Sequence, residues 1–259
     1  MLNGKKIIVV MPAYNAARTL RRVYDEVMAL DLVDVIFVVD DASQDETTAL
    51  AKTLPNVEVR THAVNRGYGA NQKLCYRLAL EAGGDIIIMV HPDYQYTPKL
   101  IPAMASLIAC GLYSTVLGSR ILGGGALSGG MPFWKYVGNR GLTFIQNMLY
   151  GAKLSEYHTG YRAFSREVLL ELNLEGNSDD FVFDSQILAQ ILWRGHRIAE
   201  VTCPTSYPPD ASSIGFVKSV QYGLGCLVTA VTFRLAKVGL IAPRLLQAEA
   251  GSHGAHEHL

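Results

Sequence analysis

The chain has 259 residues, of which 49% are hydrophobic and 18% charged, and its 23 basic residues balance its 23 acidic ones. This length and composition are typical of a globular protein with one large or two small domains, and zero net charge argues against a broad basic face for nucleic acid. The cysteines lack the spacing of a zinc site or a disulfide framework, which indicates reduced core thiols in a cytoplasmic protein. They are Cys75, Cys110, Cys203 and Cys226.

The first half of the chain alternates predicted strands with predicted helices. Uninterrupted apolar runs over 5–11, 34–41 and 85–91 are typical of strands buried on both faces, and residues 56–63 form a less apolar strand. The intervening segments carry apolar residues at helical spacing, and Ser43 and Glu46 have the spacing of a capping box. This order predicts an α/β fold, a Rossmann-like and mostly parallel sheet with helices on both faces.

The second half has longer helical segments and one glycine-rich loop. Residues 114–120 are expected to form a strand and 121–132 a loop. Helices are predicted after Pro98 and within 133–151 and 183–195, and a strand is predicted near 198. We expect one catalytic domain over 1–210, a helical extension over 211–245, and a disordered tail over 246–259.

Polar residues follow each of the first four predicted strands. The segments are "PAYN", Asp40-Asp41, "NRGYG" and "HPDYQ". Ligands of open α/β sheets bind beyond the carboxyl ends of the strands, so these segments predict one site. In the last of them, His91, Asp93 and Gln95 offer a nitrogen and two oxygens that suit a divalent cation such as Mn²⁺. The alternative is a simple turn at Pro92 and Asp93, with His91 ending the strand.

Other polar residues have both structural and functional interpretations. Asp40 and Asp41 either cap the following helix or hydrogen-bond a nucleoside. Arg120 and Arg140 are candidate anion contacts or solvated surface residues. No G-x-G-x-x-G follows the first strand, and GK[ST] and G-x-S-x-G are absent, so a P-loop, a dinucleotide site and a serine hydrolase are disfavoured.

Five motifs in the correct order resemble those of family 2 glycosyltransferases with the GT-A fold. They are "VVMPAYNA", "VVDDASQDET", "NRGYGANQ", "VLGSR" and "HTGYRAFSREVL", spread between residues 5 and 207. The pattern is most similar to the polyprenyl-phosphate sugar synthases, such as dolichyl-phosphate mannose synthases and their bacterial relatives. "HPDYQ" stands where that family has D-x-D-x-Q, so His91 replaces an aspartate. "SYPPDASSIGFVKS" departs from the family's R-x-x-G-x-S-K, and Lys218 is a candidate replacement.

The resemblance implies inverting, metal-dependent transfer of a sugar from a UDP- or GDP-sugar to an acceptor, with a polyprenyl phosphate favoured. The cation, Mn²⁺ or Mg²⁺, would bind His91, Asp93 and Gln95. The residues expected to contact substrate are Pro12, Tyr14, Asn15, Asp40, Asp41, Asn65, Gly67, Arg140 and His158. Asp93, Arg120 and Asp184 are the expected catalytic residues, and an alcohol acceptor would need a base, for which Asp184, Glu156 and His158 are candidates.

The uncharged apolar segment over 219–233 allows two interpretations. It is an interfacial helix that brings the site to a lipid acceptor, or it packs on the domain or on a second copy in a homo-oligomer. We accordingly expect a cytoplasmic protein, peripheral on the inner face of the membrane in the first case. Two alternatives remain. One is a sugar-phosphate nucleotidyltransferase, and the other is a non-catalytic nucleotide-sugar binding protein, suggested by the replacement of the family's aspartate by His91.

Overall fold

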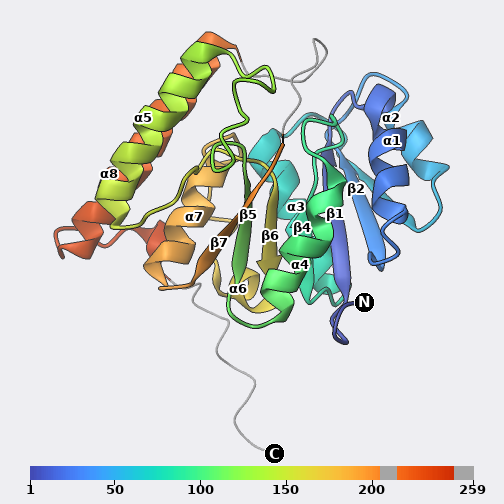
Figure 1. Cartoon of the computed structure of the whole chain (residues 1–259), viewed down its shortest axis with the longest axis horizontal. Coiled ribbons are helices and arrows are strands. Elements are labelled where there is room, and N and C mark those ends of the chain that lie inside the picture. Colours follow the sequence, from blue (N-terminus) through green and yellow to red (C-terminus); the bar gives the residue numbers. More distant parts are fainter. Residues whose placement is uncertain (205–214, 248–259) are drawn as a thin grey trace, which may run out of the picture.

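A computed structural model describes residues 1–204 and 215–247, in which a seven-stranded sheet forms the centre of the molecule (Figure 1). The strand order is β3-β2-β1-β4-β6-β5-β7, and only β6 runs antiparallel to its neighbours. The strands are β1 (Ile7–Ala13), β2 (Val35–Asp40), β3 (Val57–Thr61), β4 (Ile86–Met89), β5 (Thr115–Ser119), β6 (Arg162–Ser165) and β7 (Ile198–Thr202). The predicted mostly parallel α/β fold is confirmed.

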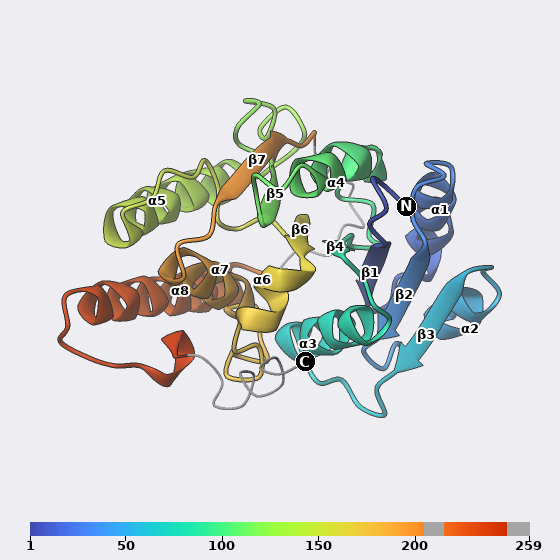
Figure 2. The ribbon, with the colours of Figure 1, turned by 90° about the horizontal axis from the view of Figure 1, so that it is seen from below.

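Helices cover both faces of the sheet. Figure 2 shows α1 and α4 on one face and α3 and α6 on the other. The helices are α1 (Ala17–Met28), α2 (Thr47–Lys52), α3 (Tyr68–Glu81), α4 (Ile101–Ala109), α5 (Phe133–Tyr150), α6 (Arg166–Glu171), α7 (Phe183–Trp193) and α8 (Phe216–Lys237). Two short 3₁₀ turns, Pro98–Leu100 and Arg244–Leu246, complete the described elements.

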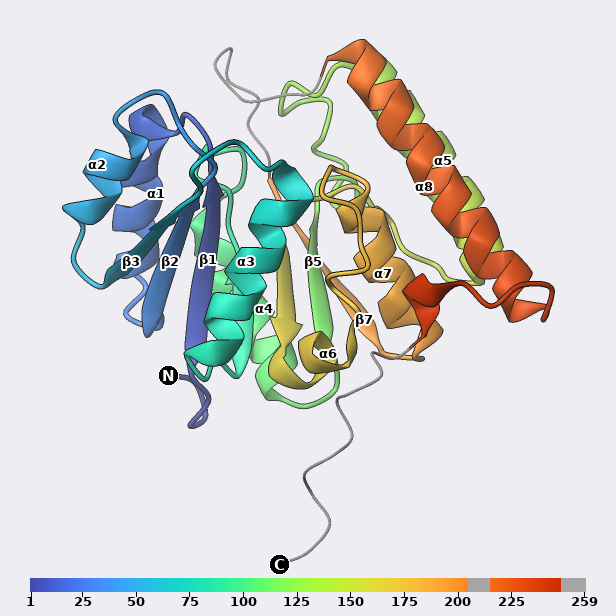
Figure 3. The ribbon, with the colours of Figure 1, turned by 180° about the vertical axis from the view of Figure 1, so that it is seen from behind.

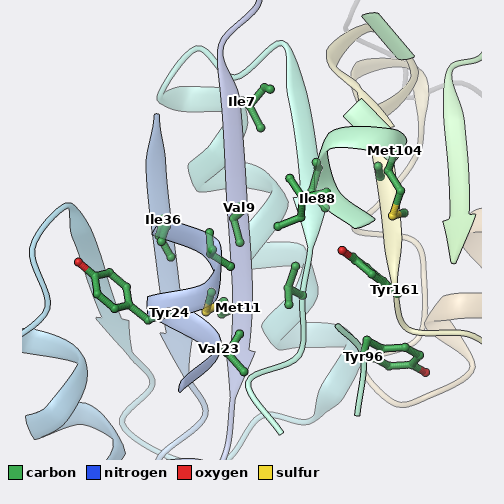
Figure 4. Close-up of a cluster of buried hydrophobic side chains, with 14 of the residues drawn as sticks. Ile7, Val9, Met11, Val23, Tyr24, Ile36, Ile88, Tyr96, Met104 and Tyr161 are labelled. Atoms are coloured by element: carbon green, nitrogen blue, oxygen red, sulfur yellow. The ribbon is translucent and has the colours of Figure 1, made fainter. Parts of the chain in front are cut away.

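The alternation of side chains along β1 explains why two cores form. Ile7, Val9 and Met11 pack with α1 and α4 residues on one face (Figure 4), whereas Ile8 and Val10 pack with α3 and α7 on the other. All seven residues of β1 are buried, as a central strand covered on both faces requires.

The reversed direction of β6 matters for the site. β6 pairs antiparallel with both β4 and β5, so its amino end lies at the edge where β4 and β5 have their carboxyl ends. The segment 156–160 before β6 therefore reaches the same edge as His91 after β4 and Arg120 after β5. The loop after β5 and the segment before β6 thus join the exits of the first four strands at this edge.

Two long helices form a separate layer beside α7. α5 and α8 lie side by side in all three ribbon views, and their carboxyl ends meet, with Lys237 Nζ near Gly151 (Figures 1 and 3). They turn buried residues toward the rest of the protein, among them Gln146 on α5 and Phe233 on α8. Among the described residues, no helix is long and apolar enough to cross a membrane.

The structure corrects two local details of the sequence prediction. β1 begins at Ile7 and extends through Pro12 to Ala13. The proline is tolerated because β4 pairs with β1 only as far as Val10, so no hydrogen bond to β4 is lost at Pro12. The predicted capping box is wrong: α2 begins at Thr47, and Ser43 instead bonds the carboxylate of Asp40. Residues 248–259 of the tail and the whole "SYPPDASS" segment lie outside the described residues.

Candidate active site

A pocket of about 1320 Å³ lies at the carboxyl edge of the sheet. Its walls include residues after β1, β2, β3, β4 and β5, the segment before β6, and the first turns of α5 and α8. The carboxyl ends of parallel strands are where open α/β sheets bind ligands. The polar strand exits predicted from the sequence therefore meet in one cavity.

The two adjacent aspartates after β2 have different roles. Asp40 is buried and accepts hydrogen bonds from Ser43 N at 3.1 Å and Thr48 Oγ1 at 2.8 Å, so it shapes the loop before α2. Asp41 lines the pocket and accepts from the backbone N–H groups of Arg66 and Gly67, at 2.7 and 3.0 Å. Asp41 thus holds the β3–α3 loop against the pocket.

Gly67 needs to be glycine in this loop. Its φ is +97°, and an added Cβ would stand 2.6 Å from the carbonyl oxygen of Asp179. A side chain would be strained by the backbone conformation and would also collide with the segment before α7. The "NRGYG" motif therefore permits close approach of two backbones, which brings Asp180 and Phe181 to the pocket.

The three candidate metal ligands after β4 all line the pocket. His91, Asp93 and Gln95 are half-buried, and Asp93 Oδ1 accepts from the backbone N–H of Gln95 at 3.0 Å. Burial lowers the pKa of His91 below its usual value, although Asp93 acts in the opposite direction. A neutral imidazole has one nitrogen with a free lone pair, as metal binding requires.

Tyr68 determines which nitrogen of His91 carries the proton. Burial and the nearby Asp184 carboxylate raise the pKa of Tyr68 well above its usual value, so its hydroxyl keeps one proton. That proton is donated to Asp184 Oδ2 at 2.9 Å, while His91 Nε2 lies 3.3 Å from the same hydroxyl oxygen. Nε2 must then donate, which leaves Nδ1 of the neutral ring unprotonated.

Asp184 lies behind this layer and does not line the pocket. Its carboxylate accepts from Tyr68 and from Gln72 Nε2 at 3.1 Å, and it lies 3.4 Å from the fully buried Arg162 guanidinium. The geometry supports a carboxylate that orients Tyr68 and neutralises Arg162. The Asp184 carboxylate does not reach the pocket, where a sugar acceptor would have to bind.

Arg120 and Glu156 form a buried pair at one wall. The Glu156 carboxylate has no exposed surface and accepts from the Arg120 backbone N–H at 2.8 Å, from Arg120 Nε at 2.8 Å and from Asn139 Nδ2 at 2.7 Å. Burial raises the pKa of Glu156, but Arg120 and these hydrogen bonds outweigh it and hold the pKa below its usual value. Glu156 is thus a fixed anion that orients Arg120.

His158 also lines the pocket, beside α8. Its Nδ1 lies 2.9 Å from Tyr222 Oη, and its Nε2 is buried with no hydrogen-bond partner in the described structure. Burial lowers the pKa of His158 to about 4, so the ring is neutral near pH 7. A neutral imidazole here could bind a hydroxyl group or phosphate oxygen of a substrate.

Most of the residues predicted from the sequence meet at this pocket. Those that line it are Pro12, Tyr14, Asp41, Asn65, Gly67, His91, Asp93, Gln95, Arg120 and His158. Those that do not are Asn15, Asp40, Arg140 and Asp184. Asn15 Oδ1 accepts from Gln44 N, and exposed Arg140 donates to the Ser155 carbonyl.

Sequence reasoning missed several pocket residues that come from helices. Tyr68, Trp134, Lys135 and Tyr222 line the cavity. Only Tyr68 had a signal, because it lies inside the "NRGYG" motif.

The arrangement of the sheet and its helices is that of the GT-A fold. Glucosyl-3-phosphoglycerate synthase from Mycobacterium tuberculosis, solved with Mn²⁺, UDP and glucosyl-3-phosphoglycerate, superposes with a TM-score of 0.69. The match covers 89% of this chain and 80% of that one at 21% identity, which establishes the fold. Many other solved structures match as well.

The sequence comparisons identify the family. The family model for glycosyl transferase family 2 matches residues 8–172, so the chain belongs to that family. A UDP-N-acetylglucosamine–dolichyl-phosphate N-acetylglucosaminyltransferase of Methanococcus voltae is 27% identical over 250 residues, 90% of this chain and 98% of the relative. An undecaprenyl-phosphate mannosyltransferase of Micrococcus luteus is 28% identical over 205 residues, 76% and 82% of the two chains. The chain is therefore a glycosyltransferase.

Proposed function

We propose that the enzyme transfers a sugar, with inversion, from a UDP- or GDP-sugar to the phosphate of a polyprenyl phosphate, using Mn²⁺ or Mg²⁺. The observation that carries the proposal is the pocket itself. One side has the polar strand exits with Asp41 and Asp93, and the other has apolar and basic residues of α5 and α8, including Trp134 and Lys218. A polar donor and an amphipathic acceptor need these two environments together.

The residues after β4 fit a divalent cation. Asp93 and Gln95 supply oxygen ligands, and His91 supplies the unprotonated Nδ1 that the Tyr68 hydrogen bond leaves available. No group of three His, Cys, Asp or Glu residues clusters as a metal site among the described residues, so diphosphate and water oxygens would complete the coordination. When bound, the cation would stabilise the negative charge that develops on the leaving diphosphate.

The protein's own residues would prepare the reaction as follows. Asp41 fixes the β3–α3 loop beside the nucleoside through two backbone N–H groups. Arg120, oriented by buried Glu156, offers a guanidinium for a phosphate group. We propose a positioning role for Asp184, through Tyr68 and His91, in place of the base suggested by the sequence.

The two carboxylates that the sequence offered as bases are not available in the described pocket, which supports an acceptor that is already ionised. Asp184 is behind the pocket, and Glu156 is paired with Arg120. An alcohol must lose a proton to attack, whereas a phosphate oxygen is already negatively charged. The names of the Methanococcus voltae and Micrococcus luteus relatives, which include polyprenyl-phosphate acceptors, agree with this proposal.

Transfer to lipid tests the proposal. The enzyme is incubated with sugar-labelled UDP- and GDP-sugars and either polyprenyl phosphate or the matching polyprenol, and labelled lipid is extracted into organic solvent. Labelled lipid is expected with polyprenyl phosphate and not with the polyprenol. Equal labelling of the polyprenol would show that a base is used and would overturn the choice of acceptor.

A further inference from the structure

The outer face of the α5–α8 pair is unusually apolar for an exposed surface. Phe144 and Met148 on α5 are 66% and 65% exposed, and Leu224 and Val228 on α8 are 58% and 66% exposed. On each helix these residues lie opposite the buried side, since they alternate at helical spacing with Gln146 or Cys226. Extended apolar surfaces of this kind mark sites that contact a partner or a membrane.

The charges of the same two helices have one sign. Residues 133–150 and 216–237 contain no Asp or Glu, although acids and bases balance over the whole chain. Arg140, Lys218, Arg234 and Lys237 are exposed on the pair. An apolar surface on helices whose charged residues are all basic is typical of a surface that lies on anionic lipid headgroups.

The face is continuous with the pocket at the amino ends of both helices. Trp134 and Lys135 of α5, and Val217 and Lys218 of α8, line the cavity. Trp134 is 44% exposed and Val217 is 68% exposed, so these first turns belong both to the outer surface and to the pocket. Tryptophan next to lysine is a composition favoured at the boundary between lipid chains and headgroups.

We propose that the outer face of α5 and α8 binds the surface of an anionic membrane and places the pocket where a lipid phosphate can enter between their first turns. This deepens the proposed function and rests on it for the identity of the acceptor. The sequence drew attention to 219–233 alone, whereas the structure adds α5 as an equal half of the surface. A second copy is a poorer occupant, because a twofold interface would bring two basic surfaces together.

Vesicle sedimentation tests the surface directly. The full chain is mixed with vesicles of phosphatidylcholine alone and of phosphatidylcholine with phosphatidylglycerol, and the bound fraction is measured. Leu224→Glu removes an apolar contact, and the expected fall in the partition coefficient is about tenfold. Leu112→Glu is the matched control, since Leu112 is 59% exposed before the amino end of β5, and it should bind as the wild type does.

Two further measurements keep this inference separate from the proposed function. Circular dichroism checks that the variants fold. In Leu224→Glu, sugar transfer to a short-chain, water-soluble polyprenyl phosphate should be unchanged, whereas transfer to a polyprenyl phosphate embedded in vesicles should fall. Wild-type protein that transfers to the soluble acceptor but binds neither vesicle would overturn the membrane surface and leave the function intact. A dimer that Leu224→Glu converts to monomers, without vesicle binding, would assign the face to a second copy and also overturn the inference.

Discussion

Replacing Tyr68 with phenylalanine tests whether a hydrogen-bond chain prepares His91 as a ligand. The substitution removes one oxygen that accepts from His91 Nε2 at 3.3 Å and donates to Asp184 Oδ2 at 2.9 Å. A half-buried Nε2–H that loses its acceptor costs about 1–3 kcal/mol, and a freed ring can adopt the other tautomer. Loss of a group that orients a metal ligand typically lowers metal affinity by about 10- to 100-fold.

The assay is Mn²⁺ binding in the presence of nucleoside diphosphate, followed by electron paramagnetic resonance, with urea unfolding in parallel. Tyr76→Phe is the control, because Tyr76 lies on the same helix and its hydroxyl bonds Gln72 Oε1 at 3.1 Å, away from His91. Both variants should lose stability, but only Tyr68→Phe should lose Mn²⁺ affinity. Equal Mn²⁺ affinity in the two variants would refute the proposed role of Tyr68.

Three further predictions concern the pocket walls. Gly160→Ala should weaken Mn²⁺·nucleotide binding in calorimetry, because its Cβ would stand 2.5 Å from His91 Nε2. Glu156→Gln should lower the free energy of unfolding in urea by about 3–5 kcal/mol, because it leaves the guanidinium of Arg120 without its buried anion. Because of His158, the free energy of unfolding should fall by at most about 3 kcal/mol between pH 6.5 and pH 4. The pKa of His158 in the folded protein is about 4, below that of a histidine in the unfolded chain, so the unfolded chain takes up the proton first. His158→Gln should flatten the plot of unfolding free energy against pH in this range.

The opposite results would contradict these predictions. Unchanged binding in Gly160→Ala would mean that the imidazole moves without cost. A stable Glu156→Gln protein would mean that Arg120 needs no anionic partner. The Glu156 contribution is distinguishable from that of His158 by pH, since a carboxyl with a lowered pKa keeps its full effect above the usual carboxyl range and loses it as the pH falls from that range through the lowered pKa.

The sequence predicts the sheet and its polar edge because both depend on local patterns. Apolar runs identify the buried strands, and the polar segments after them necessarily meet at one edge of a parallel sheet. The antiparallel direction of β6 was not predicted, because a four-residue strand has no pattern that shows its direction. Its reversal is what brings His158 to the pocket and Glu156 to Arg120.

Side-chain roles that depend on long-range contacts could not be predicted. Asp40 and Asp41 have the same chemistry, and only their opposite directions at the end of β2 assign one to a loop and the other to the pocket. Tyr68 and Asp184 are 116 residues apart in sequence but joined by a hydrogen bond. The apolar outer face of α5 could not be predicted either, since the sequence of an apolar helix is equally consistent with a helix that is buried.

The central claim is that Asp93 and its neighbours form the metal site of a nucleotide-sugar transferase. Release of nucleoside diphosphate from UDP- and GDP-sugars with Mn²⁺ or Mg²⁺, with and without polyprenyl phosphate, tests it most directly in the wild type and in Asp93→Asn. The account predicts release from one donor that needs the cation, rises with the lipid and is lost in the variant. Full release by Asp93→Asn, or tight donor binding by the wild type without any release in the presence of lipid, would contradict it.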